Sequence, residues 1–431
     1  MNARLRVLVP VFMLSLVGIV GPHIQPAFAT GAIITVNTAA GVGASDGKCS
    51  LVEAIQAANS NTAVDTCHTG SSTGTDTVAF ATGINGQVIH LSSPPDVHSN
   101  VIIKGNGRSK TQVADFEFTT SGGTSTFEHL TLVDVNNEDA TANVIDVKAT
   151  SEMNNNSGSG EKSVMHISNS TFPGVTNNSS DDNTAVSTLT ITKSIVTDVI
   201  DNNSFTGSVS HLTVTNSKTR EIDNNSGGSI TTGSIKNTTV SIFTPADDGV
   251  SVSGGTGTTV TITGSTVVGF GVGVDTDGKT KIVNSSIVGT ISENVEVNGG
   301  TTTVLNSTLT KSDLGIHRSA GSIKLTNSIV ALDSSPNCTG TVGSGGGNIS
   351  DDGSCHFSKP HDHNNKNPKL GTLANHGGRT QTQLPQQGSP AIDGGLNGPC
   401  PAIDQRGKKR PQDGNHDGTK VCDVGAVEIV P

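Results

Sequence analysis

The sequence predicts an all-β protein, a right-handed parallel β-helix that winds through turns of about 22 residues around a narrow core. Three observations predict this fold. A small residue recurs along the middle of the chain, apolar residues stand at fixed distances on either side of it, and the period leaves no room for a crossover helix. A length of 431 residues is ordinary for a solenoid, which grows along one axis.

The recurring small residue, here called the anchor, organises the repeat. The residue three positions before it is always aliphatic, and the residue two positions after it is apolar in every repeat except at Thr219. Alternation at period two predicts short strands with one buried face, each stacked in parallel on the equivalent strand of the next turn. The anchors, 20 to 27 residues apart, are Ser170, Ser194, Ser217, Thr238, Ser265, Ser285, Ser307 and Ser328.

Two series of Asn follow the same period. Asn precedes most anchors, and because Asn tolerates a left-handed backbone, this column indicates a turn of the fold, not a binding site. An Asn-Asn-Ser series starts at residues 155, 177, 202 and 224, and Asp201 and Asp223 precede its last two members. We interpret this second series as solvated turns on loops along one edge, with a binding edge as the alternative.

The start of the chain is typical of an exported protein. Residues 1–29 combine Arg4 and Arg6, an apolar run, and a small-residue cleavage site at residues 27–29, which together predict a signal peptide. An uncleaved membrane anchor is the alternative. No later segment is long and apolar enough to span a membrane, so the mature chain is not expected to insert into one.

Six Cys stand near the two ends of the chain. An even number in an exported chain indicates disulfides, and neighbour pairing is our choice among the connectivities that six Cys allow. Buried reduced thiols are the alternative. The expected local pairs are Cys49 with Cys67, Cys338 with Cys355, and Cys400 with Cys422.

A solenoid needs caps at both ends, because its core and strand edges are otherwise exposed. At the front, residues 49–59 predict a short amphipathic helix in which Ser50 and Glu53 form a capping box. The expected organisation is a signal peptide (1–29), an N-terminal cap with the first strands (30–100), β-helix repeats (101–335) and a C-terminal cap (336–431).

Two stretches resemble known bacterial modules. Residues 49–59 resemble the CSLREA motif at the start of many exported β-helix proteins, with Val52 in place of the motif's Arg. The tail resembles the choice-of-anchor Q module in its Leu370–Gly378, Gly388–Gly394, Asp404–Gly407, Arg410-Pro411 and Cys422–Glu428 segments. The resemblance implies an exported, often surface-associated protein, and it implies no particular activity.

The strongest ligand motif lies in the tail. Asp413, Asn415 and Asp417 alternate before Gly418, which is the opening of an EF-hand-type calcium loop. Val424 occupies the position where such a loop has its bidentate Glu, so Asp423 is the candidate that completes the ligand set, with Glu428 as a further one. The sequence thus predicts a Ca²⁺ site, with a plain acidic turn as the alternative.

Charge narrows the classes of partner. The net charge is −11 and the chain has no basic run, which argues against nucleic acid and anionic membranes as partners. We expect a secreted or cell-surface β-helix with a structural, adhesive or glycan-contacting role, whose partner is a polysaccharide or another surface component. The alternative is a polysaccharide lyase or a glycoside hydrolase. A glycosidase needs two carboxylates close to each other, and Asp201 and Asp223 are one turn apart. We assign no catalytic residue.

Overall fold

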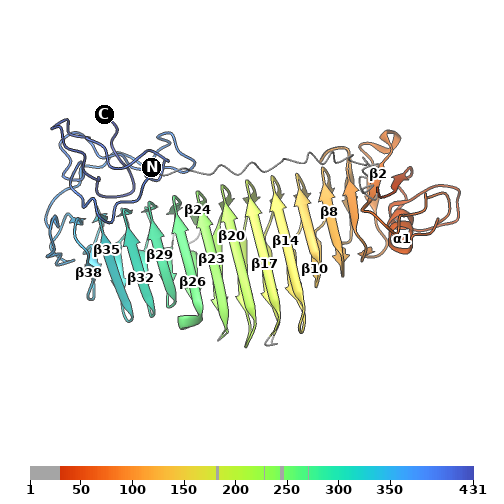
Figure 1. The fold of residues 1–431 in the computed structure, drawn as a ribbon, viewed down its shortest axis with the longest axis horizontal. Helices are drawn as coiled ribbons and strands as arrows, with labels where there is room; N and C mark the ends of the chain where they lie inside the picture. Colours follow the sequence, from red (N-terminus) through yellow and green to blue (C-terminus); the bar gives the residue numbers. More distant parts are fainter. Residues whose placement is uncertain (1–29, 181–183, 228, 243–246, 270) are drawn as a thin grey trace, which may run out of the picture.

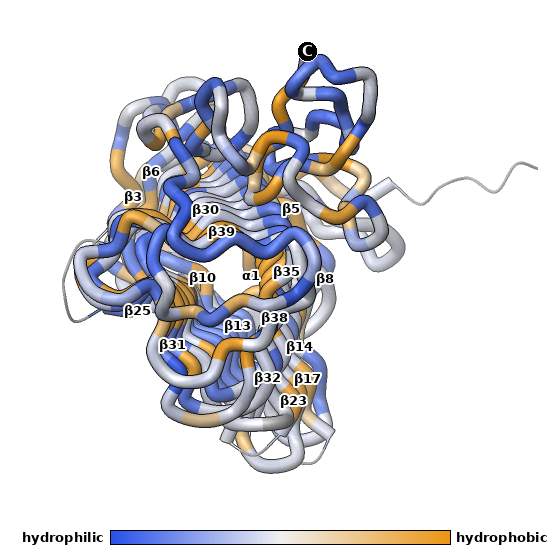
Figure 2. The backbone as a smooth tube through the Cα atoms, turned by 90° about the vertical axis from the view of Figure 1, so that its left-hand side faces the viewer, coloured by the Kyte–Doolittle hydropathy of each residue, from blue (hydrophilic) through white to orange (hydrophobic). Residues whose placement is uncertain are grey.

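The computed structural model describes residues 30–431 except 181–183, 228, 243–246 and 270, so the expected signal peptide lies outside the described residues. Three parallel sheets enclose one core, and Figure 1 shows their strands stacked along one long axis. Each full turn contributes one strand to sheet 1, then to sheet 2, then to sheet 3. The view along the axis in Figure 2 shows the resulting ring, and the predicted parallel β-helix is confirmed.

Sheet 1 is the longest of the three. In stacking order its strands are β1 (Ile33–Val36), β2 (Asp76–Phe80), β5 (Val101–Lys104), β8 (Thr124–Glu128), β11 (Thr141–Ile145), β14 (Lys162–Ser168), β17 (Val186–Thr192), β20 (Val209–Thr215), β23 (Ile230–Lys236), β26 (Thr258–Thr263), β29 (Lys279–Val283), β32 (Thr301–Leu305), β35 (Ser322–Thr326) and β38 (Gly343–Ser344).

Sheet 2 has short strands. They are β3 (Val88–His90), β6 (Gln112–Ala114), β9 (Thr131–Leu132), β12 (Lys148–Ala149), β15 (Thr171–Phe172), β18 (Ile195–Val196), β21 (Lys218–Thr219), β24 (Thr239–Ile242), β27 (Thr266–Gly269), β30 (Ser286–Val288), β33 (Thr308–Thr310), β36 (Ile329–Ala331) and β39 (Ile349–Ser350).

Sheet 3 closes each turn. Its strands are β4 (Asp96–Val97), β7 (Phe118–Thr120), β10 (Val135–Glu138), β13 (Met153–Ser157), β16 (Val175–Ser179), β19 (Val199–Ser204), β22 (Glu221–Ser226), β25 (Asp248–Ser253), β28 (Val272–Thr276), β31 (Glu293–Val297), β34 (Leu314–Arg318) and β37 (Cys338–Thr339). Two single turns of 3₁₀-helix, η1 (Thr82–Ile84) and η2 (Gly255–Gly257), lie between strands.

The columns predicted from the repeat form the core. The aliphatic residues three positions before the anchors lie on sheet 1 and are at most 1% exposed, as at Ile167 and Val304. The anchors are buried at the corner between sheets 1 and 2, and each links to the next turn, as where the Ser170 amide donates to Ser194 Oγ at 3.2 Å. The preceding Asn residues have positive φ, for example 50° at Asn169, as the turn prediction requires.

The Asn-Asn-Ser series corrects an expectation. We expected solvated turns, but these residues lie on strands of sheet 3, and the first Asn of each is 0% exposed inside the solenoid. Each side-chain amide donates to the next, at 2.6 Å from Asn155 to Asn177, from Asn177 to Asn202, and from Asn202 to Asn224. Asn can be buried in this way because an amide both donates and accepts, so that a column of amides satisfies itself.

The N-terminal cap follows the prediction. Helix α1 (Leu51–Ser60) begins at the capping box in which Ser50 accepts from the Glu53 amide and Glu53 accepts from the Ser50 amide. Its apolar side packs on the first turns through Leu51 and Ile55. A disulfide joins Cys49 to Cys67 and fixes the start of the helix to the loop that follows it.

The predicted C-terminal cap (336–431) divides into two parts. Residues 336–366 cap the last turn, where the Cys338–Cys355 disulfide and the 5% exposed Phe357 close the core. Residues 370–431, here called the tail, lie along the outer side of sheet 2 at the C-terminal end of the solenoid, as Figures 1 and 2 show. The tail is tied to successive turns, for example by Gln405 to Ser286 at 2.7 Å and by the Ala426 amide to Thr308 at 3.0 Å.

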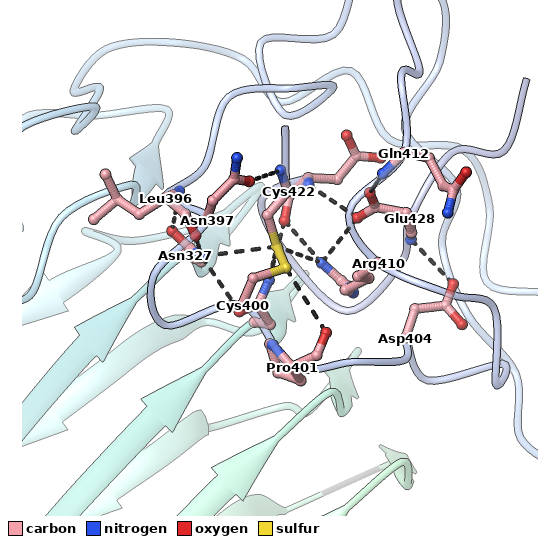
Figure 3. The surroundings of a disulfide bond; sticks show 12 residues. Asn327, Leu396, Asn397, Cys400, Pro401, Asp404, Arg410, Gln412, Cys422 and Glu428 are labelled. Carbon is pink, nitrogen blue, oxygen red and sulfur yellow. Dashed lines mark hydrogen bonds and ion pairs between the residues drawn. A yellow bond between two sulfur atoms is a disulfide. The ribbon is translucent and has the colours of Figure 1, made fainter. Parts of the chain in front are cut away.

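A buried charged cluster holds the tail together (Figure 3). The Arg410 guanidinium and the Glu428 carboxylate are 0% exposed and 3.3 Å apart. Arg410 also donates to the backbone carbonyls of Asp423 at 2.9 Å and Gly425 at 2.8 Å. The third disulfide, Cys400–Cys422, lies beside this cluster, so the neighbour pairing of all six Cys is confirmed. Burial lowers the pKa of Arg410, whereas Glu428 acts against this.

Candidate functional site

The outer face of sheet 3 carries a column of polar side chains, four of them acidic and one a Ser. The β-ladder pairs Asp201 with Asp223, then Asp223 with Ser251, Ser251 with Asp275, and Asp275 with Glu296. These side chains point outward because they alternate with the buried residues of the same strands. Successive turns of a parallel ladder are about 4.8 Å apart, so the carboxylates of neighbouring turns are close neighbours.

A second acidic row lies beside this column. Glu221, Asp248 and Glu293 are the first residues of β22, β25 and β31. All three are half-buried, as are the members of the first column. We call the two rows together the acidic face, which comprises Asp201, Glu221, Asp223, Asp248, Asp275, Glu293 and Glu296.

Burial and mutual repulsion raise the pKa values of the acidic face. Burial, and then repulsion from Asp201, raise the pKa of Asp223 to about 6. Burial and the Asp223 carboxylate raise the pKa of Glu221 to about 7, and burial and Asp275 raise the pKa of Asp248 to about 6. Part of this face is therefore protonated near neutral pH, which is unusual for carboxyl groups on an outer face.

Asp201 and Asp223 interact most closely. Burial raises the pKa of Asp201, but a side-chain hydrogen bond with Asp223 lowers it, whereas the same hydrogen bond raises the pKa of Asp223. Two carboxyl groups share a hydrogen bond only when one of them carries a proton. The two carboxyl groups therefore titrate as a coupled pair, and the pair holds a proton to a higher pH than an isolated Asp does.

Arg220 is the cation at the edge of this face. It lies between β21 and β22, and it donates from Nε to Asp247 and from Nη1 to Asp198, both at 2.9 Å. These two carboxylates occupy the guanidinium, so Arg220 holds the corner between sheets 2 and 3. The arrangement favours a structural role for Arg220 over binding of a substrate carboxylate.

The predicted calcium ligands lie in one turn, with one exception. Asp413 accepts from the amides of Asp417 and Gly418 at 3.0 Å, and Asn415 Oδ1 accepts from the Asp417 amide at 2.9 Å. The Asp423 carboxylate is instead fully buried, where it accepts from the Asp393 amide at 2.7 Å and from the Ile429 amide. Asp423 thus belongs to the interior of the tail.

The carboxylates of Asp413 and Asp417 accept from backbone amides within the turn. In the part of the chain that the structure describes, no three His, Cys, Asp or Glu side chains are grouped to hold a metal ion. A Ca²⁺ ion in this turn would be held by the side-chain oxygens of Asp413, Asn415 and Asp417, which are ligands that Ca²⁺ accepts. Calcium remains a prediction.

No family model matches the chain, and no curated protein or solved structure is significantly similar to it. The likeness to the CSLREA motif and to the choice-of-anchor Q module therefore rests on the residues quoted above. The fold and its three disulfides define the class of the molecule as a disulfide-bonded parallel β-helix. Among the described residues, no helix has the length and apolar character needed to cross a membrane.

Sequence reasoning found part of the acidic face. Asp201 and Asp223 were visible because each precedes an Asn-Asn-Ser triplet. Asp275 and Glu296 continue the same column, but their strands lack that triplet. The register itself could have revealed them, since each directly follows a buried Val of the core, Val274 or Val295.

Proposed function

We propose that the protein is an extracellular β-helix that contacts polysaccharide through its lateral faces and does not cleave it. One observation carries the proposal: sheet 3 presents a hydrogen-bonding side chain at the same place on each of five successive turns, from Asp201 to Glu296. The spacing of about 4.8 Å between turns is close to the length of one sugar unit in an extended chain. A row of carboxyl groups suits sugar hydroxyls and amino groups, which donate hydrogen bonds.

An extracellular location is part of this proposal. Three disulfides support it, because disulfides persist in oxidising compartments and are rare in the cytosol. The basic and apolar start of the chain supports export as well. The resemblance to surface-associated β-helix proteins supports retention on a cell surface.

A hydrolase is the second candidate, and the Asp201–Asp223 pair favours it. A general acid in a glycosidase needs a raised pKa, as Asp223 has. Against it, the two carboxyl groups are adjacent members of one strand ladder, whereas the two carboxyl groups of a glycosidase flank the scissile bond. The pair lies in a line of side chains along the outer face of one sheet, and this arrangement favours contact over cleavage.

The test combines binding and cleavage in one sample. The protein is incubated with cellulose, chitin, chitosan, pectate gel and alginate gel; the bound fraction is measured by sedimentation, and released reducing ends and unsaturated products are measured in the supernatant. We expect saturable binding to at least one of these polysaccharides, with no product.

Two variants locate the contact. Asp223→Asn removes a charge from the acidic face, whereas Glu161→Gln removes one from an exposed turn outside it. Weaker binding of the first variant alone supports the acidic face as the contact. Product formation that Asp223→Asn abolishes would replace the proposal with the hydrolase, and absence of binding to every polysaccharide would overturn it.

A further inference from the structure

Sheet 2 changes its surroundings along the molecule. Its outward column runs through Lys148, Lys218 and Thr239 to Thr266 and the turns that follow. Lys148 and Lys218 are exposed, whereas Thr266 is 0% exposed because the tail covers it. The leading edge of the tail, the loop of residues 375–381, ends beside β21 and β24, and it forms a cleft with them.

The cleft consists of two adjoining hollows of about 370 and about 260 Å³. Lys218, Thr239 and Arg379 line both of them, and Asn216 and Asn237 line the smaller one. Two cations thus converge on a concave surface whose other side chains are hydroxyls and amides. This combination of one recess with a few convergent polar groups is typical of a small-ligand site.

The two cations have no anionic partner in the described part of the chain. The ion pairs found there leave out both Lys218 and Arg379, in contrast to Arg220, which is held by two carboxylates. The acidic face lies on sheet 3, which is a different side of the solenoid. Salt screens charges beyond about 8 Å at physiological ionic strength, so the net charge of −11 does not cancel a local positive cleft.

Arg379 stands on a fixed loop. Residues Ala374 and Thr382 close the loop with two backbone hydrogen bonds of 3.0 and 2.9 Å. On the C-terminal side of Arg379, Thr380 Oγ1 donates to the Gly264 carbonyl at 2.9 Å, and the Gln381 carbonyl accepts from Thr266 at 2.6 Å. The loop is therefore attached to the solenoid next to Arg379, and the guanidinium is presented to the cleft from a preorganised backbone.

Gly378 shows how closely this loop packs. A Cβ atom there would lie 2.9 Å from Cα of Arg406, which belongs to a neighbouring turn of the tail. Since a backbone atom cannot give way as a side-chain end can, a side chain at position 378 would displace the loop. The geometry of the cleft thus depends on the tail as a folded unit.

We propose that this cleft binds an acidic sugar unit of an oligosaccharide, with the sugar carboxylate on Arg379 and Lys218. Arg offers a planar pair of donors that matches a carboxylate, and Lys adds a point charge. Asn216, Asn237 and Thr239 supply hydrogen bonds to sugar hydroxyls. This inference rests on the proposed function, to which it adds a second contact and a class of sugar. A sulfate group on a sugar shares the same chemistry.

The experiment measures binding of a galacturonate tetrasaccharide by calorimetry. The double variant Lys218→Gln/Arg379→Gln loses both cations of the cleft, and the matched control Lys148→Gln/Lys324→Gln loses two exposed Lys on the solenoid. We expect the Kd to rise at least tenfold in the cleft variant and to stay unchanged in the control. Equal melting temperatures of the three proteins exclude loss of the fold.

Two further ligands separate the sources of the anion. A sulfated tetrasaccharide that competes more strongly than galacturonate moves the assignment to sulfated sugars within the same cleft. Inorganic sulfate that binds as tightly as either oligosaccharide would overturn the assignment to a sugar.

The result is distinguishable from failure of the proposed function. If the cleft variant binds the tetrasaccharide as tightly as the native protein does, the cleft is overturned and the proposed function stands. If the native protein binds the neutral polysaccharides and not the tetrasaccharide, the cleft is again overturned. If the native protein binds none of the polysaccharides, both fail.

Discussion

The two faces of sheet 3 apply one stacking rule to two kinds of side chain. Inside the solenoid, Asn177, Asn202 and Asn224 stack and bind one another. Outside, Asp201 and Asp223, each one residue before an Asn of the ladder, stack and repel one another. The difference follows from hydrogen-bonding capacity, because an amide donates and accepts, whereas a carboxylate only accepts.

This comparison shows what a parallel β-helix does with a repeated motif. The fold places like residues in contact, so any residue that recurs at the period must tolerate its own copies. Amides gain from this contact even in the core. Burial and mutual repulsion raise the pKa values of the carboxyl groups, so some of them retain a proton, and this proton together with nearby water makes the contact tolerable at the surface.

The largest expected effect comes from replacing an amide of the inner ladder with a carboxylate. Asn202→Asp puts a carboxylate in the ladder, where Asn224 and the Thr232 carbonyl lose their donor. We expect a loss of stability of about 3–5 kcal/mol at pH 8, because a buried charge is left unpaired. Thermal and urea unfolding measure it.

The matched control lies one residue away. Asp201→Asn is the reverse isosteric change on the outer face, and it should leave stability unchanged or raise it by up to about 1 kcal/mol. Equal losses in the two variants would show that the faces do not differ as described.

A smaller effect tests the end of the ladder. Asn224 is the last amide, and its Nδ2 has no partner because Val252 follows in the next turn. Asn202→Val interrupts the ladder and should cost about 2–3 kcal/mol, since it leaves buried polar atoms unpaired. Val252→Asn extends the ladder toward Thr276 and should cost about 1 kcal/mol or less. Urea midpoints decide the order, and a more costly Val252→Asn would contradict the account of the ladder.

The pH dependence of stability tests the outer face. The folded-state pKa values of Asp223 and Glu221, about 6 and about 7, lie above the unfolded values of about 4, so the folded protein binds more protons between these limits. Their contribution to stability is thus complete below about pH 4 and is lost as the pH rises through 6–7. We expect the melting temperature of Asp223→Asn, minus that of the native protein, to increase as the pH rises from 4.5 to 8. A constant difference between the two would contradict the raised pKa.

The smallest effect concerns calcium, outside sheet 3. Ca²⁺ binding to the Asp413 turn would stabilise the tail by mass action. Excess chelator should therefore lower the temperature at which the tail detaches, which is measured by limited proteolysis. Asp413→Ala should remove the difference between calcium and chelator. Identical proteolysis with calcium and with chelator would count against the site.

The sequence predicted the fold because the aliphatic columns repeat without interruption, as at Ile191 and Val214. It placed the Asn-Asn-Ser series wrongly, since Asn is usually a surface residue and the alternation of a buried Asn177 with an outward Asn178 is invisible in a run of polar residues. The Asn-Asn-Ser series repeats at about the same period as the anchors, and this shared period was the signal that could have placed it on stacked strands. The Arg410–Glu428 pair and the cleft between Lys218 and Arg379 join positions far apart in the chain, and no local pattern encodes such contacts.

The attachment of the tail has a mechanical consequence. A solenoid pulled from its ends can peel apart one turn at a time, because each turn contacts only its neighbours. The tail binds Gly264, Ser286, Asn306 and Asn327, which belong to four consecutive turns. These turns must therefore yield together, so the front turns should extend at a lower force than the turns that the tail bridges.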